Sequence, residues 1–284
     1  MAADSAPPLA LGVTRILARS FDGRSETSLD PDLRVFVTDL VRPYGLPVRE
    51  DLLAEGVGHS YEELAEGLLA EALADGVPVD LLILAFDSPD VRPGAPSSLA
   101  LSRSCPGTPL AFALCDQGSA VAFSALRVAA EYQRTGACRR AVVVLAEQTA
   151  LHYRPAAPVD LPERHSVVVL VLDETADVEL TVRQFSALDG RKAAEVVGAE
   201  VGTLGADAAV LLGSGLAAEP VPGVAAAAGL PFAGLPFTGL PFTGLWAELA
   251  ERLPEWQEKG RPVLAAGFDR RLGVLSTLTL RAGP

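Results

Sequence analysis

Residues 109–136, PLAFALCDQGSAVAFSALRVAAEYQRTG, constrain the fold more than any other stretch of this chain. The apolar run Leu110 to Leu114 predicts a short buried strand, and the turn Cys115 to Gly118 follows it. The apolar positions after Ser119 predict a long buried helix, which Gly136 ends. A strand that turns sharply into a helix is where α/β enzymes expose a nucleophile, because a helix N-terminus favours negative charge. What the turn carries therefore decides the function.

The first 173 residues otherwise alternate between strands and helices. Ser60-Tyr61-Glu62-Glu63 is a capping box that begins a helix running to about Ala74. Residues 20–58 and Pro89 to Gly107 carry turn and loop signals. Apolar runs of strand length predict further strands at Leu9 to Ala18, Val79 to Phe86, Ala141 to Glu147 and Ser166 to Asp173. This alternation favours a layered α/β domain.

The pattern restarts near residue 174, which predicts two units, 1–173 and 174–284. The second unit is expected to begin with an alternating strand and to end with two strands. Its helices are expected at Arg191 to Val201 and Trp246 to Leu253, and its strands at Val178 to Phe185, Ala208 to Leu212, Val263 to Gly267 and Val274 to Leu280.

A repeat of the unit GLPF(A/T) occupies residues 229–245. Its regularly spaced Gly and Pro exclude a helix or a central strand. One interpretation is a loop lengthened by repetition. The other is a flap whose Phe232, Phe237 and Phe242 contact a partner or an acyl chain, because three exposed phenylalanines are unfavourable unless covered.

Composition excludes several classes of function. The formal net charge of −13 argues against nucleic-acid binding. Three cysteines without CxxC spacing argue against a disulfide framework or a zinc site and favour a reducing, cytoplasmic location. No apolar run is long enough to span a membrane, and the first residues do not form a signal peptide. We expect no cofactor.

Two absences bear on catalysis. The sequence contains no Asn at all. Its three histidines are His59, His152 and His165, so none lies in the second unit. His59 is expected in an exposed loop and His152 in a solvated one, and none of the three is interpreted as catalytic.

Four stretches resemble the ketoacyl synthase III branch of the thiolase superfamily. They are VDLLILAFDSPD, AFALCDQGSAVAFSALRVAAEYQRTGACRRAVVVLAE, SVVVLVLDE and GRPVLAAGFDRRLGVLSTLTL, which cover about two-thirds of the chain. The resemblance implies a five-layer α-β-α-β-α fold made of two similar halves. It also implies a dimer in which the strand before the turn lies close to the partner's equivalent strand.

Active members of this family use Cys, His and Asn, and the Cys at the helix N-terminus accepts the acyl group as a thioester. Here the nucleophile position aligns with Gly118, or with Gln117 if the gap is placed differently. Cys115 comes two or three residues too early, and the carboxylate of Asp116 would raise the pKa of its thiol. Cys115 and Asp116 are the residual catalytic candidates.

The other two catalytic positions are also lost. The family's His would fall near Leu212 or Gly213, and its Asn near Gly239, inside the repeat. Asp269 and Arg270 interrupt the family's glycine-rich turn at Gly267-Phe268. Loss of residues that act together lowers the rate by orders of magnitude, so an autonomous condensing enzyme is not expected.

The chain therefore resembles the degenerate subunit of heterodimeric ketosynthase III enzymes, such as the alkylquinolone-making synthase. That resemblance implies a pseudoenzyme that pairs with an active Cys-His-Asn homologue, as a heterodimer or heterotetramer, in bacterial secondary-metabolite or fatty-acyl biosynthesis. Acyl-CoA or acyl carrier protein would bind through the partner. The alternatives are a stand-alone acyltransferase that uses Cys115 or Asp116, and a binding protein for acyl chains.

Overall fold

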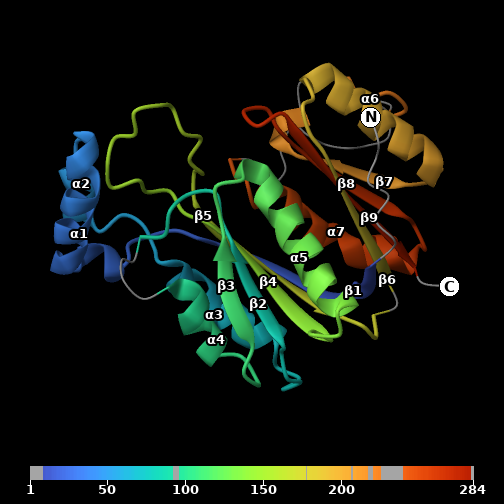
Figure 1. Cartoon of the computed structure of the whole chain (residues 1–284), viewed down its shortest axis with the longest axis horizontal. Helices are drawn as coiled ribbons and strands as arrows, with labels where there is room; N and C mark the ends of the chain where they lie inside the picture. The colour runs from blue at the N-terminus through green and yellow to red at the C-terminus, as the bar shows by residue number, and fades with distance from the viewer. Residues whose placement is uncertain are drawn as a thin grey trace.

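The computed structural model describes residues 9–91, 96–176, 178–205, 207–216, 220–224 and 239–282. In this part of the chain, nine strands form one sheet in the order β3-β2-β4-β5-β1-β6-β9-β8-β7 (Figure 1). The strands are β1 (Leu9–Phe21), β2 (Leu81–Ala85), β3 (Leu110–Leu114), β4 (Arg140–Glu147), β5 (His165–Asp173), β6 (Val178–Phe185), β7 (Ala209–Leu212), β8 (Val263–Asp269) and β9 (Val274–Ala282).

The order of the strands repeats itself across the middle of the sheet. In the first half, β2 and β4 pair in parallel, and β5 runs antiparallel between β4 and β1. In the second half, β7 and β8 pair in parallel, and β9 runs antiparallel between β8 and β6. β6, β7, β8 and β9 thus stand where β1, β2, β4 and β5 stand in the first half. Within the sheet, the described residues of the two halves join at two residue pairs between β1 and β6.

The helices complete five layers, as expected from the sequence. The helices α5 (Val121–Arg134) and α7 (Gly244–Glu258) share a core with the inner faces of both halves of the sheet. Helices α3 (Tyr61–Ala72) and α4 (Ser97–Arg103) cover the outer face of the first half, and α6 (Gly190–Leu204) covers that of the second. The thiolase-like fold class is therefore confirmed.

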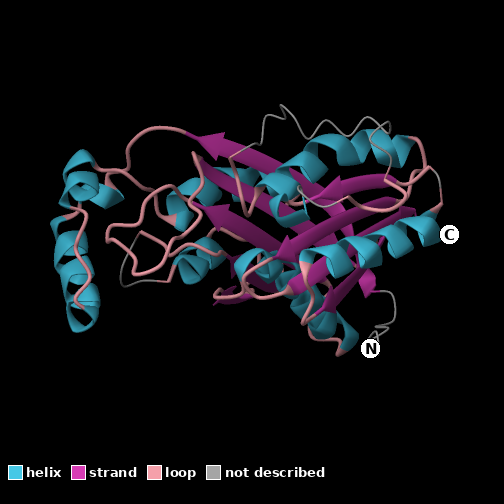
Figure 2. Ribbon diagram, turned by 90° about the horizontal axis from the view of Figure 1, so that it is seen from above, coloured by secondary structure: helices cyan, strands magenta, loops and turns pink. Residues whose placement is uncertain are grey.

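A two-helix arm extends from one end of the molecule, as Figures 1 and 2 both show. It consists of α1 (Pro31–Val41), the short helix Arg42–Tyr44 and α2 (Glu50–Glu55). The sequence predicts a mixed segment here, with turns at Asp22-Gly23 and Asp30-Pro31. The Asp30-Pro31 pair, taken for a turn, begins a helix instead: the Asp30 side chain accepts a hydrogen bond from the Asp32 backbone N–H at 2.9 Å.

Two further expectations need correction. The segment expected as a loop between Pro89 and Gly107 contains α4. The strand β3 has its predicted bounds but is not buried: it lies at the edge of the sheet, and Leu110 is 52% exposed. An apolar run of five residues does not distinguish an edge strand from a central one, and β3 pairs with β2 alone.

No helix in the described parts of the chain is long and apolar enough to cross a membrane.

Candidate functional site

The turn between β3 and α5 keeps the shape of a nucleophile-bearing corner. Asp116 lies in the left-handed region, with φ of 61°, and Gly118 has φ of 53°. A short helix, Gly118–Ala120, leads directly into α5. Gln117 is tied to the helix, because its side-chain oxygen accepts a hydrogen bond from the Ser124 hydroxyl at 2.6 Å. The corner therefore has a fixed geometry.

The carboxylate of Asp269 fills the nucleophile position. A Cβ atom added to Gly118 would lie 1.7 Å from Oδ2 of Asp269. The same oxygen accepts a hydrogen bond from the Ser119 backbone N–H at 3.1 Å, and Oδ1 accepts one from the Leu272 N–H at 2.9 Å. A side chain of the protein itself thus occupies the place at the helix N-terminus where a catalytic anion would be stabilised.

A second carboxylate adds negative charge at the same corner. Asp87 follows β2, and its pKa is raised mainly by burial and also by the charges of Asp269 and Asp116. Arg271, 3.9 Å away, opposes this shift. With three carboxylates at the corner, an additional anion such as a thiolate is disfavoured.

The surroundings of Cys115 disfavour its thiolate form. Its Sγ donates a hydrogen bond to Oδ2 of Asp116 at 3.3 Å, and its pKa is raised by burial and by Asp116. The other two cysteines are buried, and burial raises the pKa of Cys105 and of Cys138 to about 11. These shifts keep all three thiols protonated at neutral pH.

The second half contains a matching arrangement at the N-terminus of α7. Glu147, the last residue of β4, is 2% exposed. Its Oε2 accepts the Phe242 backbone N–H at 3.2 Å, and its Oε1 accepts the Thr243 N–H at 2.8 Å and also the Thr243 hydroxyl. Glu147 of the first half thus caps α7 of the second half, while Asp269 of the second half caps α5 of the first.

The sequence analysis did not assign either cap. A signal for both was present, because an acidic residue ends each of two strands that are otherwise apolar, AVVVLAE and VLAAGFD. Since β4 and β8 are counterparts in the repeated strand order, Glu147 and Asp269 occupy corresponding positions. They form one pair of reciprocal caps across the central layer.

Apolar side chains fill the space around the position expected for the family's His. A Cβ atom on Gly213 would meet the Ala266 carbonyl oxygen at 3.4 Å and Leu245 at 3.9 Å, and one on Gly267 would meet the Phe123 ring at 3.0 Å. Phe123 in turn packs on Trp246, with ring centroids 4.9 Å apart.

The GLPF repeat is described only in its last part. Gly239, near the expected Asn position, accepts a hydrogen bond from the Glu163 N–H at 2.9 Å through its carbonyl. Phe242 is buried, 5% exposed, in the central core, so it is a core residue and not part of an exposed flap. Phe232 and Phe237 lie outside the described residues.

The three histidines lie at the base of the arm, where the His152 carbonyl accepts a hydrogen bond from the Arg49 N–H at 2.8 Å. The rings of His59 and His165 are 4.3 Å apart. His152 is buried, and its Nε2 is 2.8 Å from the Val57 carbonyl oxygen. The expectation of a solvated loop is therefore wrong for His152, which is only 5% exposed, and His59 is only partly exposed.

Lowering the pH should reduce the stability of the folded protein through the histidines at the base of the arm. Burial and the charge of His59 lower the pKa of His165 to about 4, although the charge of Asp22 opposes this shift. Burial also lowers the pKa of His59, and the charge of Glu63 opposes that shift. Protonation is then favoured only after unfolding, so stability falls as pH drops from about 6.5 towards 4. Denaturant midpoints should give a loss of about 1–2 kcal/mol from pH 7 to pH 5. His165→Gln should remove much of this pH-dependent loss of stability. An unchanged dependence of stability on pH in this variant would show that His165 is not its source.

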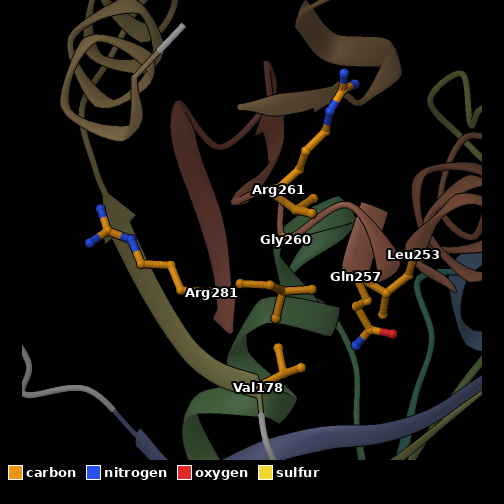
Figure 3. A pocket seen from close by; sticks show the side chains of 8 residues that line it. Val178, Leu253, Gln257, Gly260, Arg261 and Arg281 are labelled. Atoms are coloured by element: carbon orange, nitrogen blue, oxygen red, sulfur yellow. The ribbon is translucent and has the colours of Figure 1, made fainter. Parts of the chain in front are cut away.

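A cavity of about 300 Å³ lies at the end of β6, β8 and β9 that is opposite to the Asp269 corner (Figure 3). Aliphatic side chains form its floor, whereas the Arg261 and Arg281 side chains extend outward from its rim. The residues that line it are Val178, Leu253, Gln257, Gly260, Arg261, Val263, Leu280 and Arg281. It contains none of the residues expected from the sequence to form a site.

Comparison with known proteins places the chain by its fold. No protein-family model and no curated protein matches the sequence. The acyltransferase ChlB3 has a similar structure, with a TM-score of 0.61 at 16% identity, covering 96% of this chain and 98% of ChlB3. OleA from Xanthomonas campestris matches with a TM-score of 0.60 at 12% identity, and coverage of 96% and 98%. CsyB matches with a TM-score of 0.61 at 13% identity, and coverage of 96% and 99%.

These likenesses extend over almost the whole chain and show that it has the thiolase-like fold of these proteins.

Proposed function

We propose that this chain is a catalytically inactive ketosynthase III-like subunit that pairs with an active Cys-His-Asn homologue. The observation that carries the proposal is the Asp269 carboxylate, which stands 1.7 Å from where a side chain on Gly118 would begin. A nucleophile at Gly118 and this carboxylate are mutually exclusive. The absence of any Asn, and of any His beyond His165, removes the remaining catalytic groups of the family.

The open edge of β3 supports pairing. Its five residues are all at least partly exposed, and only its β2 side is hydrogen-bonded within the described chain. Soluble proteins rarely leave a straight apolar edge strand uncovered. A partner of the same fold would cover it, and the partner's own site would then meet acyl-CoA or acyl carrier protein.

The pathway is proposed from the neighbours. ChlB3 is an acyltransferase, and AbyA1, which matches 78% of this chain with a TM-score of 0.51 and 19% identity, is a tetronic acid condensing enzyme. We infer a role in bacterial secondary-metabolite or fatty-acyl biosynthesis, in which this subunit stabilises the dimer and shapes the partner's acyl pocket.

The test is to purify the chain with and without a co-expressed thiolase-like chain that has an intact Cys-His-Asn set. We expect a stable complex, acyl transfer only when the partner is present, and no mass increase on this chain after incubation with acyl-CoA. Cys115→Ala should leave the activity of the complex within about twofold. Turnover by this chain alone that Cys115→Ala abolishes would overturn the proposal in favour of a stand-alone acyltransferase.

A further inference from the structure

The cavity of about 300 Å³ lies at one end of the central core, apart from the Asp269 corner. Its floor consists of Leu253, Val263 and Leu280, which are buried residues of that core, and of Val178, which packs against the core. Sites for small molecules are mostly apolar hollows of about 300–1,000 Å³ with a few polar groups. The cavity therefore has the lining of a small-molecule site and a volume at the lower end of that range.

Backbone hydrogen bonds fix the walls of the cavity. One wall is formed by the paired strands β8 and β9. At the other wall, helix α7 ends in a turn at Gly260, which has φ of 61°. The Gly260 N–H donates to the Gln257 carbonyl at 3.0 Å, and the Arg261 N–H donates to the Trp256 carbonyl at 2.9 Å, which is a common closure of a helix C-terminus. A ligand would thus enter a preformed site at little cost in conformational entropy.

Two arginines at the mouth of the cavity have no ion-pair partner. Arg261 and Arg281 are exposed, and neither forms an ion pair or a side-chain hydrogen bond within the part of the chain that the structure describes. Glu255, which is close to Arg261, forms an ion pair with Lys259. Glu179 lies opposite Arg281 in the pairing of β6 with β9 but makes no ion pair with it. Both guanidinium groups are therefore available to an anion.

The two arginines stand on different sides of the mouth, as Figure 3 shows. Arg281 extends outward from the end of β9, and Arg261 extends outward from the segment after α7. Exposed arginines have many accessible rotamers, so turning a guanidinium group over the mouth requires only side-chain rotation. The planar guanidinium group matches the geometry of a carboxylate. A carboxylate at the mouth would lie between two cations, above an apolar floor.

The volume limits the length of the ligand. A water molecule, and a methylene group of similar size, occupies about 30 Å³, so the cavity holds about ten such groups. Octanoate has this size, because it consists of a straight chain of eight carbons and two carboxylate oxygens, about ten non-hydrogen atoms in all.

We propose that this cavity binds a medium-chain carboxylate, with the hydrocarbon chain against Leu253, Val263 and Leu280 and the carboxylate between Arg261 and Arg281. The inference goes beyond the proposed function and does not rest on it, since it requires neither a partner subunit nor acyl transfer.

The experiment is a calorimetric titration of the purified chain with sodium octanoate, for which we expect a Kd of about 0.1–1 mM. The double variant Arg261→Ala, Arg281→Ala should raise this Kd at least about tenfold, because it removes the charged hydrogen bonds to the carboxylate. Arg139→Ala is the matched control, since Arg139 is also exposed but lies just before β4 in the first half of the sheet. Its Kd should stay within about twofold of the unmodified chain.

Two analogues and a second variant test the two ends of the ligand separately. Octanol keeps the chain without the charge and should bind about tenfold more weakly than octanoate. Butanoate keeps the charge but lacks four methylene groups, so it should bind at least about 100-fold more weakly. Val178→Phe narrows the cavity from its partly buried edge and should raise the Kd for octanoate about tenfold, with an unchanged melting temperature showing that the fold is intact.

The other outcomes overturn the proposal. No binding of octanoate would show that the cavity is not a site for this class of ligand. Binding that neither the double arginine variant nor Val178→Phe weakens would place octanoate elsewhere on the protein. Equal affinity for octanol and octanoate would refute the role of the two arginines. None of these results bears on the proposed function, which is tested by the complex with an active homologue.

Discussion

Replacing Gly118 with alanine should destabilise the protein by about 3 kcal/mol, a large effect for one methyl group. The new Cβ would overlap Oδ2 of Asp269 at 1.7 Å, and Asp269 cannot withdraw without losing its hydrogen bonds from Ser119 and Leu272. The backbone adds to the loss, because Gly118 has φ of 53°, a region that alanine adopts at a cost of about 1 kcal/mol.

The two contributions can be separated with a matched glycine. Gly136 has φ of 75° and nothing within 4 Å of its added Cβ, so Gly136→Ala should cost only the backbone part, about 1 kcal/mol. Asp269→Ala combined with Gly118→Ala should be less destabilising than the sum of the two single variants, since the overlap disappears. Urea denaturation supplies these energies. Equal losses for Gly118→Ala and Gly136→Ala would show that Asp269 does not occupy the nucleophile position.

Most regular elements follow from local patterns. The bounds of β3 and β6 agree with the sequence, and the capping box at Ser60 is complete, with Glu63 bonded back to the Ser60 N–H at 2.8 Å. These elements are set by apolar period and by caps a few residues away. Helices α1 and α4 were missed because Asp30-Pro31 and Pro96 before them are residues that begin turns as readily as helices.

The candidate site was only partly predictable. The sequence shows directly that the chain has no Asn and no His after His165. It also shows Asp269 as a residue that interrupts a glycine-rich turn. Its contact with the Ser119 N–H joins residues 150 positions apart. The exposure of β3 likewise depends on which strands pair with it. Local patterns do not determine such long-range contacts.

Glu147 should be the most sensitive carboxylate of the chain to substitution. Glu147→Ala leaves the buried backbone N–H groups of Phe242 and Thr243 without their acceptor, and each buried donor left unsatisfied costs about 1–3 kcal/mol. We expect a loss of about 4 kcal/mol, together with faster hydrogen exchange of the Thr243 amide. Glu258→Ala, at an exposed position of the same helix α7, is the control and should change stability by less than about 0.5 kcal/mol.

Glu147→Gln distinguishes loss of the acceptor from loss of the charge. Burial raises the pKa of Glu147 in spite of its hydrogen bonds from Thr243 and Phe242, so the folded state favours the protonated form. A raised folded-state pKa means that the contribution of Glu147 is greatest below its ordinary pKa and declines as pH rises through the folded value. Glutamine keeps a hydrogen-bond acceptor, so Glu147→Gln should cost less than Glu147→Ala. Because neither variant titrates at this position, the loss of stability relative to the wild type should be smaller at pH 7 than at pH 4 for both. Because Glu147 caps a helix of the opposite half, as Asp269 does in return, either alanine variant should also make the denaturation transition less cooperative. If the alanine and glutamine variants were equally stable and both unfolded in a fully cooperative transition, the reciprocal caps would not couple the halves.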